Sequence, residues 1–229
     1  MEHFSWFTLL NLIEHDHMLG AVLVLLMLTA IGFVLRSKLS ADSAVIPDSN
    51  ISFSNFFQII GLDFLFDIFE NIFGSKEKAK KYFPLLAGSF FFILFLNLLG
   101  VVPGFLPPTG TLNTTLAFGI LIFVLYNYYG FKEHGISYLK QFAGPVLFLA
   151  PLMIIIEIIS HLVRPISLSL RLFMNVTGDH MVLGVFTNLT HLIVPAIFVG
   201  LGIFVSFLQA FIFTVLSAIY IALAEAHTH

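Results

Sequence analysis

The sequence predicts an all-α membrane protein that crosses the bilayer several times. Of its 229 residues, 59% are hydrophobic and only 10% are charged, whereas soluble domains carry about 25% charged residues. Several apolar runs approach the roughly 20 residues that a helix needs to cross a bilayer. The net charge of −3, with scattered basic residues, excludes an extended nucleic-acid-binding surface. We expect a single membrane domain over 1–229, with about five membrane helices and one amphipathic surface helix.

The first predicted span covers residues 18–35. It contains no charged residue, and Arg36 and Lys38 follow it at once. Basic residues border the cytoplasmic ends of membrane helices, so this span should enter from outside. The preceding residues carry carboxylates in place of a basic region, which argues against a cleaved secretory signal.

Residues 53–73 are predicted to form an amphipathic helix on the membrane surface. Three carboxylates recur there at spacings of four and three among Phe and Ile side chains. These carboxylates are Asp63, Asp67 and Glu70. Four lysines then mark a cytoplasmic border; they are Lys76, Lys78, Lys80 and Lys81. Spans at 83–102 and 114–131 should follow. Three tyrosines near the end of the second of these spans are expected in an interfacial aromatic belt; they are Tyr126, Tyr128 and Tyr129.

The last part of the chain predicts two long helices, at 144–186 and 196–225. A helix of about 43 residues would run roughly 65 Å, and the hydrocarbon core is about 30 Å thick. An upright helix cannot fit, so we expect a tilted hairpin with a kink at Pro165. An odd number of crossings places the N-terminus outside and the C-terminus in the cytoplasm.

A row of polar residues recurs at intervals of three or four along 144–186, which predicts one helix face. Its members are Glu157, His161, Arg164, Leu168, Arg171, Asn175 and Gly178. An arginine at the centre of a bilayer costs at least about 2.5 kcal/mol. Arg171 therefore requires a partner.

The partner of Arg171 is not evident in its own helix. Glu157 lies about 21 Å away along the axis and Asp179 about 12 Å away, beyond the reach of an ion pair. Gln209 on the last helix can donate or accept a hydrogen bond but cannot neutralise a guanidinium. This indicates an anion supplied by another chain or a ligand. A static ion pair with a carboxylate from elsewhere in this chain stays an alternative.

Other polar residues have simpler interpretations as well. Glu157 can pair with His161 or Arg164, and Asn97 and Gln209 can join helices by hydrogen bonds, as amides commonly do in membranes. Adjacent side chains diverge, so the run 15–17 (His-Asp-His) does not predict a metal site. The chain has no cysteine and therefore no thiolate metal site. We expect no metal and no cofactor.

Two motifs carry a family resemblance. "RPISLSLRLFMN", followed by "LQAFIFTVLSAIY" and preceded by "FLNLLG", resembles subunit a of the F-type ATP synthase in its bacterial form. The resemblance implies a hairpin of tilted helices facing a rotating ring of c subunits, each with one buried carboxylate. It also implies two aqueous half-channels, one to each side of the membrane.

The resemblance assigns roles to residues by position. The essential arginine falls on Arg171, and a proton path includes Glu157, His180, Asn175, Gln209, Asn97, Ser160, Asp179 and His161. Four of these match inlet-side residues: Asn175, Glu157, Ser160 and Asn97. Many bacterial members have Glu at the position of His180 and His at that of Gly202, so the relay here should use His180 with water, Asp179 or Glu157. Gly100 also replaces a common acidic residue.

The predicted function is therefore the stationary proton-translocating subunit of a rotary ATP synthase. It performs no phosphoryl transfer itself, since it has no Gly-rich Lys-Ser/Thr loop. Its partners would be the ring of c subunits, the peripheral-stalk b subunits, the other synthase subunits and lipid, in a bacterial inner membrane, with no nucleic acid. The alternatives are a secondary transporter or channel for an anionic substrate and a non-conducting scaffold.

Overall fold

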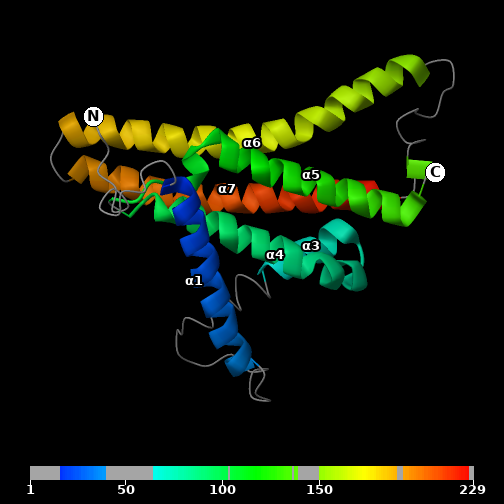
Figure 1. Cartoon of the computed structure of the whole chain (residues 1–229), viewed down its shortest axis with the longest axis horizontal. Coiled ribbons are helices and arrows are strands. Elements are labelled where there is room, and N and C mark those ends of the chain that lie inside the picture. The colour runs from blue at the N-terminus through cyan, green and yellow to red at the C-terminus, as the bar shows by residue number, and fades with distance from the viewer. Residues whose placement is uncertain are drawn as a thin grey trace. The chain divides into compact units, whose positions relative to one another are not determined.

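The structure, a computed structural model, describes residues 16–39, 64–102, 104–135, 137–138, 150–189 and 193–226. Within these ranges every regular element is a helix (Figure 1). The α-helices are α1 (Asp16–Leu39), α3 (Phe66–Phe73), α4 (Lys76–Leu99), α5 (Leu112–His134), α6 (Ala150–Leu189) and α7 (Ile193–Glu225), and η5 (Pro108–Gly110) is a short 3₁₀ turn. The predicted all-α class is confirmed.

Four of these helices are long and apolar enough to cross a membrane. They are α4, α5, Pro151–Thr187 of α6 and Val194–Glu225 of α7. The first predicted span lies in α1, where the apolar stretch His17–Phe33 is shorter. Of the predicted surface helix 53–73, residues 53–63 lie outside the described residues, and the remainder contains α3. A polytopic membrane protein is therefore confirmed.

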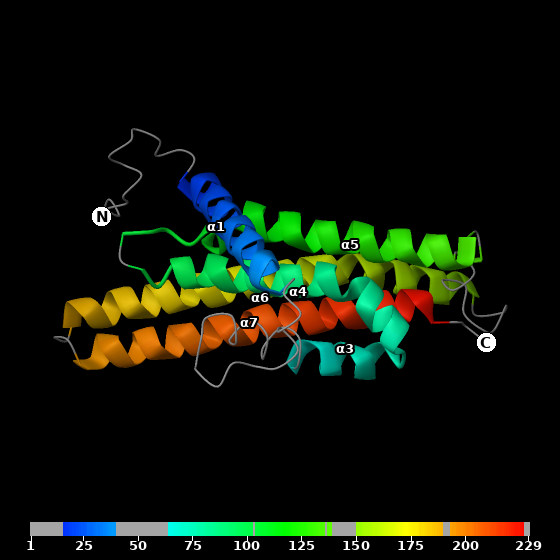
Figure 2. The ribbon, with the colours of Figure 1, turned by 90° about the horizontal axis from the view of Figure 1, so that it is seen from below.

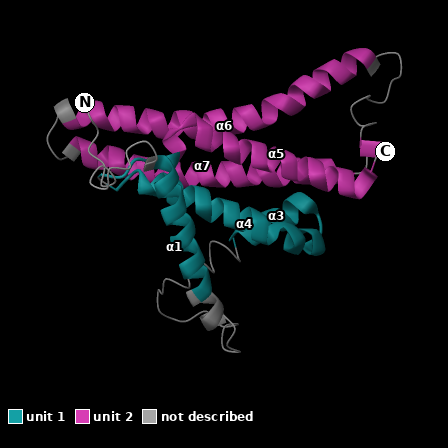
Figure 3. Ribbon diagram, in the orientation of Figure 1, with its two compact units in different colours: residues 1–108 teal, residues 109–229 magenta. Residues whose placement is uncertain are grey.

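The chain divides into two compact units, Met1–Pro108 and Thr109–His229 (Figure 3). In the first unit α1 and α3 each pack against α4. Gly74 ends α3 in the left-handed region at φ 63°, and its N–H donates to the carbonyl of Glu70. This conformation suits glycine, and it turns the chain so that Phe73 stacks on Tyr82 of α4, with ring centroids 5.2 Å apart.

In the second unit α5, α6 and α7 pack against one another in pairs. The buried positions of α5 recur every three or four residues, which places them on one face; they include Gly119, Ile122, Tyr126 and Gly130. A Cβ on Gly119 would lie 2.6 Å from the carbonyl oxygen of Pro165 and would also collide with the hydroxyl of Ser169. Only glycine therefore allows α5 and α6 to approach this closely.

Helices α6 and α7 form an antiparallel hairpin, and the two helices run side by side in Figure 2. Two contacts fix how they are aligned. The rings of Phe186 and Phe198 stack with centroids 4.5 Å apart, and the guanidinium carbon of Arg164 lies 5.4 Å from the ring centre of Tyr220. These contacts are 22 residues apart on both helices. Between them, each step of one residue forward along α6 therefore corresponds to one residue back along α7.

The alignment of α6 and α7 determines which residues lie at the same height. Counting seven residues inward from the Arg164–Tyr220 contact places Arg171 level with Phe213. Four residues further along, Asn175 is level with Gln209. Gln209 therefore lies one helical turn, about 6 Å along the axis, from the height of Arg171.

Both hairpin helices are too long to stand upright in a bilayer. With 40 and 33 residues, α6 and α7 extend roughly 60 and 50 Å, about twice the hydrocarbon thickness. Helix α6 continues through Pro165 without a break, and its N-terminal end curves away from α5 and α7 (Figure 1). Residues 151–156 at that end are all exposed.

Candidate functional site

Arg171 lies on the exposed side of α6. Its neighbours Leu168 and Leu172 are buried and seat the helix against the rest of the unit, whereas the Arg171 side chain is exposed. Within the part of the chain that the structure describes, Arg171 makes no ion pair and no hydrogen bond. No described carboxylate neutralises it, as the spacing along the helix predicted.

The residues of the polar row of α6 differ in how far they are exposed. His161 is buried and Arg171 is exposed, while Glu157 and Asn175 are intermediate. At 3.6 residues per turn, steps of three and four rotate in opposite directions, and the row spreads over roughly 100° of the helix. The row therefore straddles the border between the packed and the exposed sides of α6.

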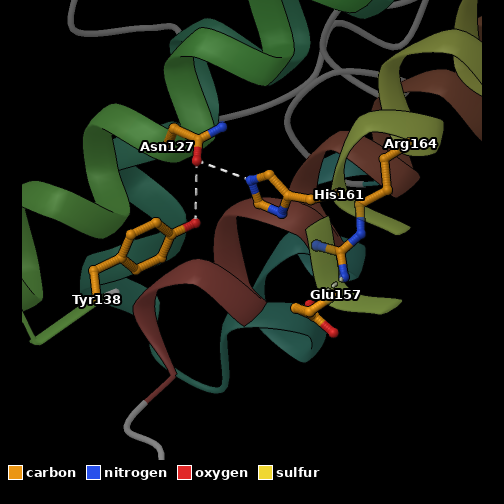
Figure 4. A network of polar contacts seen from close by, with 5 residues as sticks. All are labelled: Asn127, Tyr138, Glu157, His161 and Arg164. Carbon is orange, nitrogen blue, oxygen red and sulfur yellow. Dashed lines mark hydrogen bonds and ion pairs between the residues drawn. The ribbon is translucent and has the colours of Figure 1, made fainter. Parts of the chain in front are cut away.

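On the packed side, His161 belongs to a hydrogen-bonded network (Figure 4). Its Nε2 lies 2.9 Å from Oδ1 of Asn127 on α5, and the hydroxyl of Tyr138 lies 3.3 Å from the same oxygen. The Nδ2 group of Asn127 donates to the carbonyl of Phe123 at 2.7 Å. Because Oδ1 can only accept, both Tyr138 and the Nε2–H of His161 donate to it.

Aromatic rings enclose the network around His161. The rings of Phe123 and Tyr126 meet the imidazole edge-on, with centroids 5.3 and 5.1 Å away. Burial raises the pKa of Tyr138, outweighing the opposing effect of the positive charge on Arg164, so its hydroxyl keeps its proton and can donate.

Tyr126 was predicted to belong to an interfacial aromatic belt, and for this residue the expectation is wrong. Its side chain is only 1% exposed, whereas Tyr128, two residues on, is 58% exposed. A separation of two residues on a helix places side chains on opposite sides, so Tyr126 turns toward His161 while Tyr128 points outward.

Glu157 and Arg164 form an ion pair at the border of the packed side (Figure 4). Oε1 of Glu157 lies 3.6 Å from Nη2 of Arg164, and the two side chains are 36% and 27% exposed. The guanidinium also lies over the ring of Tyr220 on α7, a cation–π contact. Of the two partners that the sequence allowed for Glu157, the structure selects Arg164.

On the C-terminal side of Arg171, several predicted path residues are half-buried. Asn175, Asp179 and His180 have intermediate exposure on α6, and Gln209 has intermediate exposure on α7. A Cβ added to Gly202 would meet nothing within 4 Å. Gly202 on α7 therefore borders open space.

The structure separates some residues that the sequence had grouped. Glu157 and Ser160 lie on the N-terminal side of Arg171, and Asn175 lies on the other side, all on one continuous helix. These three residues therefore lie at different heights along α6, and their assignment to one inlet stays a prediction. Asn97 is buried in α4, in the other compact unit.

Sequence reasoning gave no role to Asn127, Tyr138 or Tyr220. A signal for the first was present: Asn127 is a single amide inside an otherwise apolar and aromatic run, "LIFVLYNYY", and such amides usually find a partner on another helix. Among the described residues, no group of three His, Asp or Glu side chains is placed to hold a metal ion.

Comparison with known proteins matches residues 18–222 to the family described as ATP synthase A chain. The chain is 44% identical to ATP synthase subunit a of Bdellovibrio bacteriovorus, with 99% of both chains covered. It is 42% identical to ATP synthase subunit a 1 of Syntrophotalea carbinolica, covering 99% of this chain and 95% of that one. It is 51% identical to the subunit of Geobacter sulfurreducens over 66% of this chain and 67% of that one.

Proposed function

The chain belongs to the ATP synthase A chain family, and from this premise we propose that it is the stationary proton-translocating subunit of a rotary F-type ATP synthase. Its partners are then the ring of c subunits, the peripheral-stalk b subunits and the other subunits of the synthase. It is a multi-pass protein of a bacterial inner membrane, with its N-terminus outside and its C-terminus in the cytoplasm.

The observation that carries this proposal is the exposed guanidinium of Arg171, which has no carboxylate partner among the described residues. A permanent cation on an apolar helix requires an anion. As the ring turns, the buried carboxylate of each c subunit would reach Arg171 and supply this anion. The cation lowers the proton affinity of the arriving carboxylic acid and opposes the passage of a free proton.

Two half-channels would meet the ring on either side of Arg171. With the proposed orientation, α6 begins on the cytoplasmic side, so Glu157 and Ser160 lie toward the cytoplasm. The residues C-terminal to Arg171 lie toward the outside; they are Asn175, Asp179 and His180, with Gln209 on α7. Each proton crossing about 100 mV releases roughly 2.3 kcal/mol.

The outer half-channel needs a carrier in place of the acidic residue that many relatives have. The open space at Gly202 supports a water-filled route past His180, since a water needs both room and polar partners. His161 is less suited to carry protons, because its Nε2 is engaged by Asn127 on the packed side of α6. We assign His161 to the packing of the hairpin.

The test is the Arg171→Ala variant in whole complexes. ATP-driven proton pumping into inverted membrane vesicles should be abolished while the complex still assembles. Leu152→Ala, at an exposed position near the start of α6, is the matched control and should pump normally. Pumping by assembled Arg171→Ala complexes would overturn the proposal.

The alternative function, a carrier or channel for an anionic substrate, draws on the same exposed arginine. It requires that the purified chain alone moves an anion across a vesicle membrane. The near-complete coverage of relatives named as synthase subunits favours the first function.

A further inference from the structure

Helix α6 carries two arginines whose surroundings differ. Arg164 and Arg171 are seven residues apart, which is almost two full turns, so they lie about 10 Å apart along the axis and on nearly the same side of the helix. Arg171 is exposed and makes no ion pair among the described residues, whereas Arg164 is paired with Glu157. The difference requires an explanation, because both guanidiniums are permanently charged.

The position of Glu157 determines where the charge of Arg164 lies. Glu157 is seven residues before Arg164, so the contact of 3.6 Å draws the guanidinium toward the N-terminal end of α6 and away from Arg171. Tyr220 holds the same guanidinium from the side of α7. Arg164 is thus neutralised and also anchored between the two hairpin helices.

We infer that Glu157 is a counterion that neutralises Arg164, so that Arg171 is the only uncompensated guanidinium that α6 presents, within its described residues, to a passing carboxylate. The inference rests on the function proposed above. Without Glu157, two cations about 10 Å apart would attract the same anion, and charges that are partly withdrawn from water are screened less than fully exposed ones. An ionised ring carboxylate would then be retained beside Arg164, and each step of the ring would slow.

This role differs from that of a proton carrier, which the family resemblance implied for Glu157. A carrier must gain and lose a proton at every passage, so its carboxylate is required whatever residue stands at position 164. A counterion matters only because Arg164 is present. Removing Arg164 together with Glu157 therefore distinguishes the two roles.

The experiment compares E157Q, R164Q and the double variant E157Q/R164Q as whole complexes in inverted vesicles. Proton pumping is measured per ATP hydrolysed and per assembled complex. For a coupled pair we expect E157Q to lower pumping about tenfold and the double variant to recover to within about twofold of R164Q. E157D, which keeps the charge, should retain more pumping than E157Q.

Two outcomes would overturn the inference. One is a double variant that pumps as weakly as E157Q, because the carboxylate would then be needed in its own right. The other is an E157Q variant that pumps normally. Arg171→Ala in the same vesicles tests the proposed function separately, so its loss of pumping, combined with no recovery in the double variant, rejects the counterion role alone.

Discussion

The ring nitrogen Nε2 of His161 lies 2.9 Å from Oδ1 of Asn127, and this hydrogen bond joins α6 to α5. Tyr138 donates to the same oxygen from the segment after α5. This part-buried acceptor with two donors joins three parts of the chain at once. The network therefore holds the N-terminal third of α6 against α5.

Replacing Asn127 by leucine removes the acceptor of this network. The Nε2–H of His161 and the hydroxyl of Tyr138 would be left buried without it, at a cost of about 1 to 3 kcal/mol for each group. The Asn127→Leu variant should unfold at a clearly lower temperature in detergent. Tyr128→Phe, on the exposed side of the same helix, is the control and should unfold like the parent. Equal unfolding temperatures for Asn127→Leu and the parent would contradict the network.

The stability provided by Tyr138 should depend on pH. Because burial raises its pKa above the ordinary 10.0, the folded protein binds this proton more tightly than the unfolded chain does. The contribution is complete below the unfolded pKa and is lost as the pH rises through the folded pKa. The difference in unfolding temperature between the parent and Tyr138→Phe should therefore be largest near neutral pH and shrink above about pH 10. A difference that stays constant over this range would count against the assignment.

Gly119→Ala should separate α5 from α6. The added Cβ would approach the backbone oxygen of Pro165 to 2.6 Å, and backbone cannot move aside as the end of a flexible side chain can. Overpacking of this kind costs about 1 to 3 kcal/mol. The measurement is the unfolding temperature, with Gly200→Ala as control, since a Cβ there meets nothing within 4 Å. If both variants unfold alike, the close approach at Gly119 is wrong.

The alignment of α6 and α7 can be tested by cross-linking, and the absence of cysteine in the chain supplies a clean background. A cysteine pair at Phe186 and Phe198, whose rings are 4.5 Å apart, should cross-link with a short reagent. A pair at Asn175 and Gln209 should also react, because these residues are level. A pair at Asn175 and Tyr220 is the control and should not, because it is displaced by about three turns, roughly 16 Å. Efficient linking of the control pair would show a different alignment.

The long apolar helices could be predicted because length and hydropathy are local properties of a sequence. The isolation of Arg171 from Glu157 followed in the same way, from the fixed rise of a helix. What depends on the rotation of one helix against another could not be predicted. Tyr126 was placed in an interfacial belt because aromatic residues favour membrane interfaces. This preference does not say which side of a helix faces lipid, so the burial of Tyr126 could not be predicted.

The pairing of Asn127 with His161 was missed for a related reason. These residues are 34 positions apart, and only the close approach of α5 and α6 at Gly119 brings their helices into register. The grouping of Glu157 with Asn175 as inlet residues came from the family resemblance. Glu157 precedes Arg171 in the sequence and Asn175 follows it. Because the structure makes this stretch one continuous helix, the two residues lie on opposite sides of Arg171 along the helix axis.

The close contact between α5 and α6 at Gly119 also affects how firmly Arg171 is held. Ser169, which meets Gly119 at the point of closest approach, stands two residues before Arg171, about 3 Å along the axis. In the function proposed above, a rotor carboxylate that binds Arg171 would therefore act on α6 close to its contact with α5. The contact with α5 thus supports α6 next to Arg171, whereas residues 151–156 at the N-terminal end of α6 are exposed.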